Sequence, residues 1–229
     1  MLPNTDPAPW SRPLTPLALC ALLLALTPPA PASGDPLAAN GYHAGENHSS
    51  EVHAGEDLAG IDLSDADLSK TDLTGTLLTG GVLERTDLSD AVLDGADLTA
   101  ARLVDAALSE ASLMGVYAPQ LDATGADFSA AWLCGAQLAG SHLEGADFSR
   151  ASLVGADLGG VTGFESADFN AAYYDAETVL PEGLDPAAEE MIEVDDCEAA
   201  PLPEPGGPVG MAAGFALAGL LAARRRKQG

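Results

Sequence analysis

A large apolar residue recurs at almost every fifth position between Leu58 and Leu158. A period of five fits neither regular element by itself. On an α-helix such residues would lie about 140° apart, and a long strand alternates its side chains with a period of two. Each five-residue unit must therefore contain its own turn. The large apolar positions are Leu58, Leu63, Leu68, Leu73, Leu78, Leu83, Leu88, Leu93, Leu98, Leu103, Leu108, Leu113, Phe128, Leu133, Leu138, Leu143, Phe148, Leu153 and Leu158.

Within each unit, the residue two positions before the large apolar residue is usually small, as in Ala66. Residues two apart lie on one side of a short extended segment, and the polar pair that follows supplies the corner. At Val116 and Leu121 the large residue comes first and Ala118 and Ala123 follow, so volume is conserved and we expect the repeat to continue. A unit this small cannot bury its own apolar side. The pattern therefore predicts a solenoid in which each coil covers its neighbours.

The blocks at 66–70, 96–100 and 146–150 read ADLSK, ADLTA and ADFSR. They resemble the pentapeptide repeat, A(D/N)LXX. The resemblance implies an all-β fold, a right-handed quadrilateral β-helix with four repeats per coil and leucine or phenylalanine at the centre of each side. We assign residues 56–175 to this β-helix. The apolar content is mostly alanine and leucine, which suits a narrow stack of repeats better than a broad core.

The first 32 residues have the character of a secretory signal peptide. Arg12 lies in the leading segment, an apolar run covers 14–26, and Ala30 and Ala32 form an Ala-x-Ala cleavage site. We expect cleavage after Ala32. The alternative is an uncleaved N-terminal anchor, for which the apolar run is short.

The C-terminal end carries a second targeting pattern. Residues 195–208 read as an acidic, proline-rich linker, and 209–229 as a hydrophobic segment with a basic tail. Together they resemble the PEP-type sorting signal of Gram-negative exported proteins. The resemblance implies cleavage by an exosortase-like membrane enzyme, with release to, or attachment at, the cell surface; the alternative is a permanent tail anchor. The residues of this signal are Pro203, Glu204, Pro205, Arg224, Arg225 and Arg226.

We expect a C-terminal cap over residues 176–194, because an uncovered last coil would offer unpaired backbone groups to another strand. The segment 172–186 is similar to the ending that follows many bacterial pentapeptide arrays. Asp185 and Pro186 predict the start of a short helix that runs to Val194. The expected apolar lid consists of Tyr174, Val179, Leu180, Leu184, Met191 and Ile192.

Three histidines, His43, His48 and His53, fall on the same five-residue grid ahead of Leu58. Residues 33–55 form either a flexible leader or a degenerate first coil. In a coil the three imidazoles would share inward positions, where they could hold zinc or copper. The alternatives are a loose leader or a capping coil whose polar positions face solvent.

Aspartates line one side of the expected solenoid. Taking every twentieth residue gives a column of Asp67, Asp87, Asp127 and Asp147, interrupted by Ala107. After Leu158 the grid slips by one residue, and Asp168 would continue the column. Two aspartates on successive coils could share a weakly bound calcium ion. The alternative is that each aspartate accepts hydrogen bonds from backbone amides of its own corner.

Trp132, Tyr117 and Cys134 are expected to project outward near one another. Exposed aromatic side chains of this kind can mark a contact with sugar or protein. Cys134 and Cys197 could pair in an oxidising compartment, but their separation in sequence gives no geometric support, so their pairing stays open.

The chain has 35 acidic residues against 9 basic ones, a net charge of −26. Such a surface repels nucleic acid and acidic membranes. The sequence shows no catalytic constellation, and the carboxylates follow the repeat instead of converging on a cleft. It predicts a non-enzymatic, exported solenoid at the cell surface or in the extracellular matrix. Its expected partners are the membrane sorting machinery during export, and then a surface polysaccharide or protein, with no nucleic acid.

An alternative comes from the resemblance, since some cytoplasmic members mimic DNA and bind a type II topoisomerase. The acidity fits that alternative. The two end signals argue against it, because such a topoisomerase lies in the cytoplasm.

Overall fold

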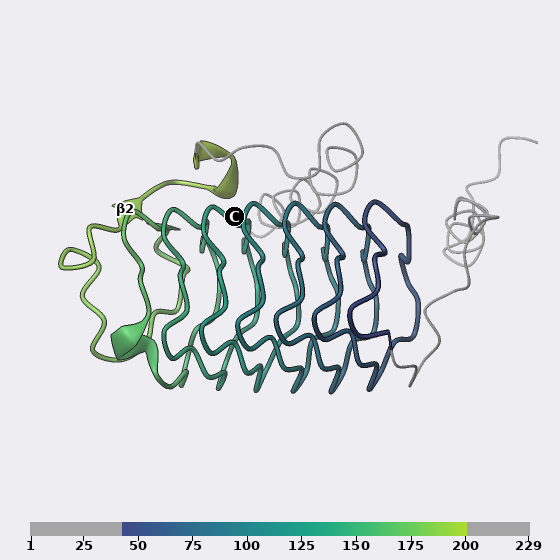
Figure 1. Cartoon of the computed structure of the whole chain (residues 1–229). Helices are drawn as coiled ribbons and strands as arrows, with labels where there is room; N and C mark the ends of the chain where they lie inside the picture. Colours follow the sequence, from purple (N-terminus) through teal and green to yellow (C-terminus); the bar gives the residue numbers. More distant parts are fainter. Residues whose placement is uncertain (1–42, 201–229) are drawn as a thin grey trace, which may run out of the picture. The chain divides into compact units, whose positions relative to one another are not determined.

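The computed structural model describes residues 43–200, which form a stack of four-sided coils (Figure 1). Each residue that precedes a large apolar position pairs in parallel with the residue one coil later, as Asp67 does with Asp87 twenty positions on. The backbone bonds run in both directions: Leu68 N donates to Asp87 O at 2.7 Å, and Asp87 N donates to Ala66 O at 2.9 Å. Because a coil spans twenty residues and each repeat spans five, each coil has four sides.

The corners are tight turns with one recurring backbone feature. Thr71 N donates to Leu68 O at 3.2 Å, and Lys70, the third residue of that turn, has a φ of 61°. Gly75 repeats the arrangement with a φ of 66°. A positive φ at the third residue only is the pattern of a type II turn. The fifth residue of nearly every unit therefore lies in the left-handed region, which glycine adopts without strain.

The core is a narrow column of inward side chains. The large apolar positions alternate with small residues, and the exchanged residues Val116 and Leu121 are equally buried. Phe128, Phe148 and Phe169 stack in parallel, with ring centroids 4.8 and 5.2 Å apart. Fully buried core residues include Leu58, Leu63, Leu68, Leu73, Leu98, Leu103, Phe128, Leu133, Phe148, Leu153 and Leu158.

The coils begin earlier than residue 56. Asn47 pairs with Asp67 and Val52 with Asp72, and His43 N donates to Asp62 O at 2.9 Å. Residues 43–55 thus belong to the first described coil, so this part of the chain is a degenerate coil and not a flexible leader.

The grid slips by one residue at the expected place, since Asp147 pairs with Asp168. The extra residue is taken up beside the short 3-10 helix η1 (Phe164–Ser166). Gly163 precedes it with a φ of 76°, and a Cβ there would lie 2.8 Å from Glu144 N. Only glycine fits this corner without a backbone shift.

The last coil is irregular, and the predicted helix at 186–194 is wrong. β1 (Tyr173–Tyr174) pairs in parallel with β2 (Ile192–Glu193), while Val179 pairs with Asp157. Asp185 caps a single turn, with Oδ1 accepting from Ala187 N at 3.0 Å. Glu190 then takes a φ of 53° and the chain enters β2.

The predicted apolar lid forms only in part. Leu184 and Met191 are half-buried and pack against the core. Val179 and Ile192 are largely exposed, so they do not cover it.

The chain after β2 turns back along the outside of the coils. Residues 194–200, here called the tethered segment, contain the 3-10 helix η2 (Cys197–Ala199), and Cys197 forms a disulfide with Cys134. Ala200 is buried against Trp132 and its neighbours. The predicted linker, 195–208, therefore begins with residues that are attached to the solenoid.

The predicted signal peptide, 1–32, and the sorting signal at 203–229 lie outside the described residues. Among residues 43–200, no helix is long and apolar enough to cross a membrane.

Candidate functional site

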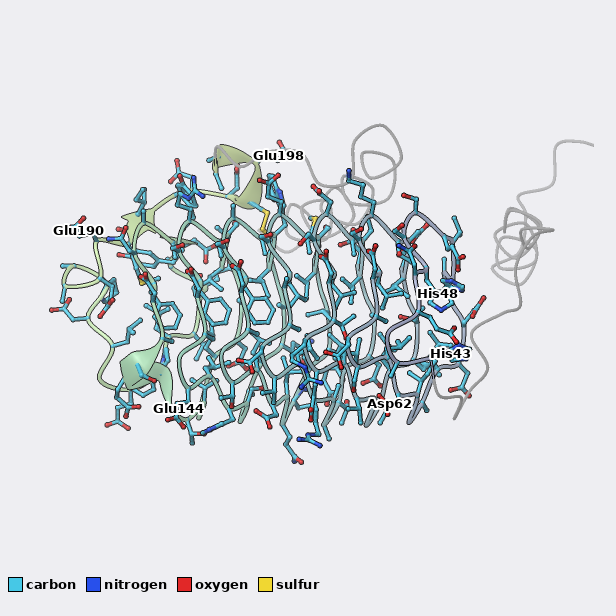
Figure 2. All side chains as sticks on the ribbon, viewed as in Figure 1. His43, His48, Asp62, Glu144, Glu190 and Glu198 are labelled. Carbon is cyan, nitrogen blue, oxygen red and sulfur yellow. A yellow bond between two sulfur atoms is a disulfide. The ribbon has the colours of Figure 1, made fainter. Side chains whose placement is uncertain are left out.

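The first described coil differs from all later ones in its inward side chains. Three of its four large positions hold His43, His48 and His53, the fourth holds Leu58, and glutamate occupies positions that elsewhere hold small residues. We call His43, Glu46, His48, Glu51, His53 and Glu56 the His/Glu arc. His43 and His48 lie at one end of the described coils (Figure 2). The arc thus places polar side chains over the inward leucines of the next coil, while Leu58 of the same coil already belongs to the apolar core.

Histidine and glutamate alternate along the arc at contact distance. Glu46 Oε2 lies 2.9 Å from His43 Nδ1 and 3.2 Å from His48 Nε2. Glu51 Oε2 lies 3.0 Å from His48 Nδ1 and 2.9 Å from His53 Nε2. Each of these carboxylates therefore joins two successive imidazoles.

The last contact along the arc, between His53 Nδ1 and Glu56 Oε1, is longer, at 3.4 Å. His48 and His53 consequently have carboxylate oxygens beside both ring nitrogens. A neutral imidazole has one N–H donor and one lone pair, so one of the two contacts on each ring would set a lone pair against an oxygen. A metal ion at one ring nitrogen would remove this repulsion, while the N–H at the other nitrogen donates to its carboxylate.

The contacts with histidine lower the pKa values of Glu46 and Glu51. The hydrogen bond with the His43 side chain is the main reason that the pKa of Glu46 lies below its ordinary value. Burial acts to raise the pKa of Glu51. Its hydrogen bonds with His48 and His53 together outweigh burial, so the pKa lies below its ordinary value. Both carboxylates are thus held in the ionised form that can bind a cation.

Two groups in the arc have the composition of a metal site: His43 with Glu46 and His48, and His48 with Glu51 and His53. In each group the ligand atoms lie within 4.8 Å of one another. The three predicted histidines are brought together, but they form two overlapping groups that include glutamate. The sequence signal for the glutamates was their place on the inward grid, two residues before the next large position.

The aspartate column forms as predicted in its geometry. Asp67, Asp87, Asp127 and Asp147 each accept a hydrogen bond at Oδ1 from the backbone N–H two residues on, at 2.8 to 3.0 Å. Asp168 continues the column and makes the same bond with Asn170 N. This is the corner role that the sequence analysis gave as the alternative to calcium binding.

Calcium binding by the column stays a prediction. The hydrogen bond with the Ser69 side chain is the main reason that the pKa of Asp67 is lowered. Asn47 Nδ2 also donates to Asp67 Oδ2 at 2.7 Å.

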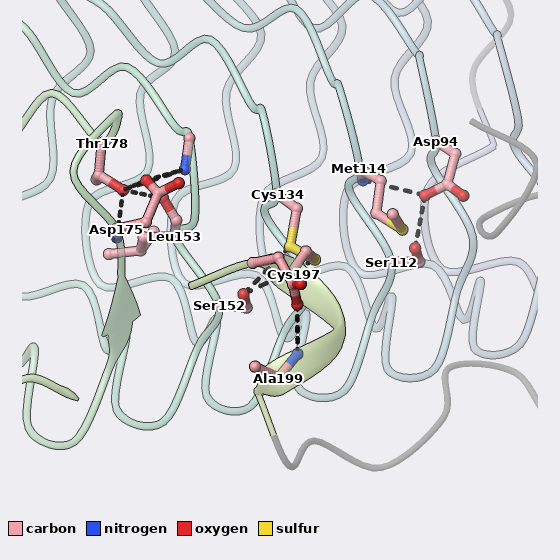
Figure 3. The surroundings of a disulfide bond; sticks show 12 residues. Asp94, Ser112, Met114, Cys134, Ser152, Leu153, Asp175, Thr178, Cys197 and Ala199 are labelled. Carbon is pink, nitrogen blue, oxygen red and sulfur yellow. Dashed lines mark hydrogen bonds between the residues drawn. A yellow bond between two sulfur atoms is a disulfide. The ribbon is translucent and has the colours of Figure 1, made fainter. Parts of the chain in front are cut away.

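The expected outward group of Trp132, Tyr117 and Cys134 does not form. Trp132 and Cys134 are buried under the tethered segment, whereas Tyr117 lies on another side and is 47% exposed. Cys134 and Cys197 have Cα atoms 6.1 Å apart, within the range for a disulfide (Figure 3). Met114, Val154 and Tyr173 complete this outer apolar cluster.

A buried carboxylate lies beside this cluster (Figure 3). Asp94 Oδ1 accepts hydrogen bonds from Ser112 Oγ and, at 3.0 Å, from Met114 N. Asp94 Oδ2 is buried with no hydrogen-bond partner among the described residues. Burial is the main reason that the pKa of Asp94 is raised.

A family model described as pentapeptide repeats matches eight copies, over residues 54–80, 82–115 and 122–161. The repeat region belongs to the pentapeptide repeat family. Family membership confirms the fold class that the resemblance implied, a right-handed quadrilateral β-helix. Members of this family are generally structural or binding proteins and not enzymes. The search of curated proteins gives no match.

Solved pentapeptide-repeat structures resemble the chain. HetL from the cyanobacterium Nostoc sp. strain PCC 7120, described as involved in heterocyst differentiation regulation, is 27% identical with a TM-score of 0.42, over 60% of this chain and 76% of HetL. Rfr23 from Cyanothece 51142 is 24% identical with a TM-score of 0.34, over 62% and 88%. A pentapeptide repeat protein of the Arabidopsis thaliana thylakoid lumen is 26% identical with a TM-score of 0.31, over 47% and 64%.

Proposed function

We propose that this pentapeptide solenoid is a non-enzymatic binding or structural module, exported to the cell surface or extracellular matrix of a Gram-negative bacterium. The observation that carries the proposal is the disulfide between Cys134 and Cys197. Disulfides persist in oxidising compartments outside the cytoplasm and are rare inside it. The disulfide therefore supports the same location as the signal-peptide character of residues 1–32, through an independent property of the chain.

The outer sides supply the binding surfaces in this proposal. The aspartate column gives one side a row of carboxylates, each with Oδ1 held by its corner, and Asp67 Oδ2 in addition accepts a hydrogen bond from Asn47 Nδ2. A surface polysaccharide or a protein is the proposed partner, with calcium as a weak bridging ion. Hard divalent cations prefer such oxygen ligands, and few protein ligands give affinities near millimolar. During export the membrane sorting machinery is the further partner.

The competing function is a DNA-mimicking rod that binds a type II topoisomerase. It requires the same acidity but a cytoplasmic location with reduced thiols. The location of the mature protein and the state of its cysteines therefore separate the two functions.

The test is fractionation of the native host, followed by mass spectrometry of the mature ends and a non-reducing peptide map. We expect a surface or extracellular species that begins near Ser33, lacks residues 224–229 and contains a Cys134–Cys197 cross-linked peptide. An intact Met1 and Gly229 on a soluble cytoplasmic species with free thiols would refute export and favour DNA mimicry.

A further inference from the structure

We propose that the His/Glu arc binds one zinc ion, through His48, Glu51 and His53. This proposal does not depend on export, because it rests only on the geometry of the first described coil. It commits to an imidazole and carboxylate ligand set, which neither the acidic column nor the repeat pattern requires.

The donor atoms are spaced nearly as a zinc ion requires. Zinc holds imidazole nitrogen and carboxylate oxygen at about 2.0 to 2.2 Å, so neighbouring ligands of a tetrahedral ion lie about 3.4 Å apart. Glu51 Oε2 lies 3.0 Å from His48 Nδ1 and 2.9 Å from His53 Nε2. Zinc binding would widen these two contacts by about half an ångström and bring the two nitrogens, which lie within 4.8 Å of each other, to about 3.4 Å.

Burial favours this group over its neighbour. The side chains of His53 and Glu51 are 6% and 40% exposed, whereas those of His43 and Glu46 are 18% and 53% exposed. At a less hydrated site, water competes less with the side chains for the metal ion, and packing holds the imidazoles in place. Glu46 lies beside the other nitrogen of His48, where it can orient the ring, as carboxylates do for metal-bound histidines.

The shared histidine sets the stoichiometry. His48 belongs to both groups, and a neutral imidazole offers a single lone pair to a metal. Only one of the two groups can therefore bind an ion at a time. Two histidines and one glutamate leave a fourth position for water, the arrangement of open zinc sites.

The ligand set also determines which ions compete. Imidazole nitrogen suits zinc and copper, whereas calcium and magnesium prefer oxygen ligands throughout. We expect copper(II) to displace zinc, since the order of affinities places it above zinc for such ligands.

A purely structural arc is the rival explanation. In that case the histidines and glutamates only pair with one another and provide a polar cover for the apolar column. The rival predicts that the arc affects stability but that zinc has no specific effect on it.

The experiment is calorimetric titration of the untagged, metal-stripped chain with zinc chloride at pH 7.5, with thermal melts in parallel. We expect one ion per chain and a higher melting temperature, because zinc binds the folded state. His48→Gln should weaken binding at least tenfold. The matched control is His142→Gln, which removes a histidine whose Nε2 lies 3.5 Å from Glu144 Oε2 outside any three-residue group; it should bind zinc like the parent.

Glu51→Gln is the second variant, because it keeps the side-chain shape if His48→Gln weakens the coil. It should also lose at least tenfold in affinity, and cobalt(II) bound to the parent should show the intense absorption bands of a four-coordinate ion. Undiminished zinc binding by His48→Gln and Glu51→Gln would overturn the proposal. So would a parent melting temperature that zinc raises no more than calcium at equal concentration, since that result would leave the arc as a polar cover only.

Discussion

The stacked phenylalanines allow a test of how the core of this solenoid is held together. Phe148 stacks on Phe128 at 4.8 Å and on Phe169 at 5.2 Å, with ring planes within 5° of parallel. Phe128 has only one such partner among the described rings. The two residues occupy equivalent inward positions, both fully buried, so they differ chiefly in the number of ring neighbours.

Replacing each with leucine isolates that difference, because leucine occupies most equivalent positions and the backbone accommodates it. A stacked aromatic pair contributes about 0.5 to 1.5 kcal/mol beyond its buried area. Phe148→Leu should therefore lower the free energy of unfolding by about 1 to 3 kcal/mol through lost stacking, and Phe128→Leu by about half of that. The loss of apolar volume is common to both variants and cancels in the comparison.

Urea unfolding followed by far-UV circular dichroism measures both values, provided that the slope m is unchanged. The variant with both substitutions gives a second test. It should be less destabilised than the sum of the single variants by about 0.5 to 1.5 kcal/mol, because the shared pair is counted twice in the sum. Equal losses for Phe128→Leu and Phe148→Leu, or strictly additive losses, would refute the stacking argument.

Leu98→Ala should destabilise the chain by about 2 to 5 kcal/mol because Leu98 is fully buried, whereas Leu77→Ala, at a residue 45% exposed, should change the free energy of unfolding by less than about 1 kcal/mol; equal melting losses would contradict the inward grid. Calcium should raise the melting temperature more than sodium chloride of equal ionic strength, and the rise should shrink in Asp127→Asn/Asp147→Asn, whose amide oxygens keep the corner hydrogen bonds; an unchanged response in that variant would leave the aspartates as corner residues. Because burial raises the pKa of Asp94 above 3.8, its folded form holds a proton that the unfolded form has lost, so its contribution to stability falls as pH rises above that value. The stability of the parent relative to Asp94→Asn should therefore fall between pH 4 and neutral pH in urea titrations, and a pH-independent difference would show that the burial is without effect.

The sequence was sufficient to predict the coils, because the five-residue period directly sets the side-chain direction. The slip after Leu158 was visible in the displaced motif that contains Asp168, and the structure confirms it through the pairing with Asp147. The exchange at Val116 and Leu121 was also predicted correctly, since conserved volume is enough to keep an inward position filled.

The irregular C-terminal part was not predictable in the same way. Asp185 and Pro186 give local signals for a helix start, but pairing of β2 with β1 competes with helix continuation and prevails after one turn. Propensity is a weak guide where tertiary pairing is available. The tethered segment was missed because its composition is that of a linker.

A signal for the tethered segment did exist in the outward positions. Met114, Cys134 and Val154 follow large positions at intervals of one coil, which makes an apolar stripe on one outer side. Such a stripe requires a covering segment, and a disulfide between Cys134 and Cys197 would identify the residues around Cys197 as that segment. The sequence predicts only part of the arc for a related reason: its histidines differ from the leucines of the grid, whereas glutamate is so frequent in this chain that Glu46 and Glu51 are not distinctive.

The two ends of the described solenoid are stabilised by different chemistry, and this difference bears on where unfolding starts. In a solenoid each coil contacts only its neighbours, so opening proceeds from an end. The disulfide joins Cys134, in a coil before the last, to Cys197 after it, so the intervening coils cannot separate freely while it is intact. The first described coil has no covalent connection of this kind among the described residues, and three of its four large inward positions hold histidine. Its stability therefore depends on the charge balance of the His/Glu arc, which places the proposed zinc site at the coil where a bound ion would most affect the order of unfolding.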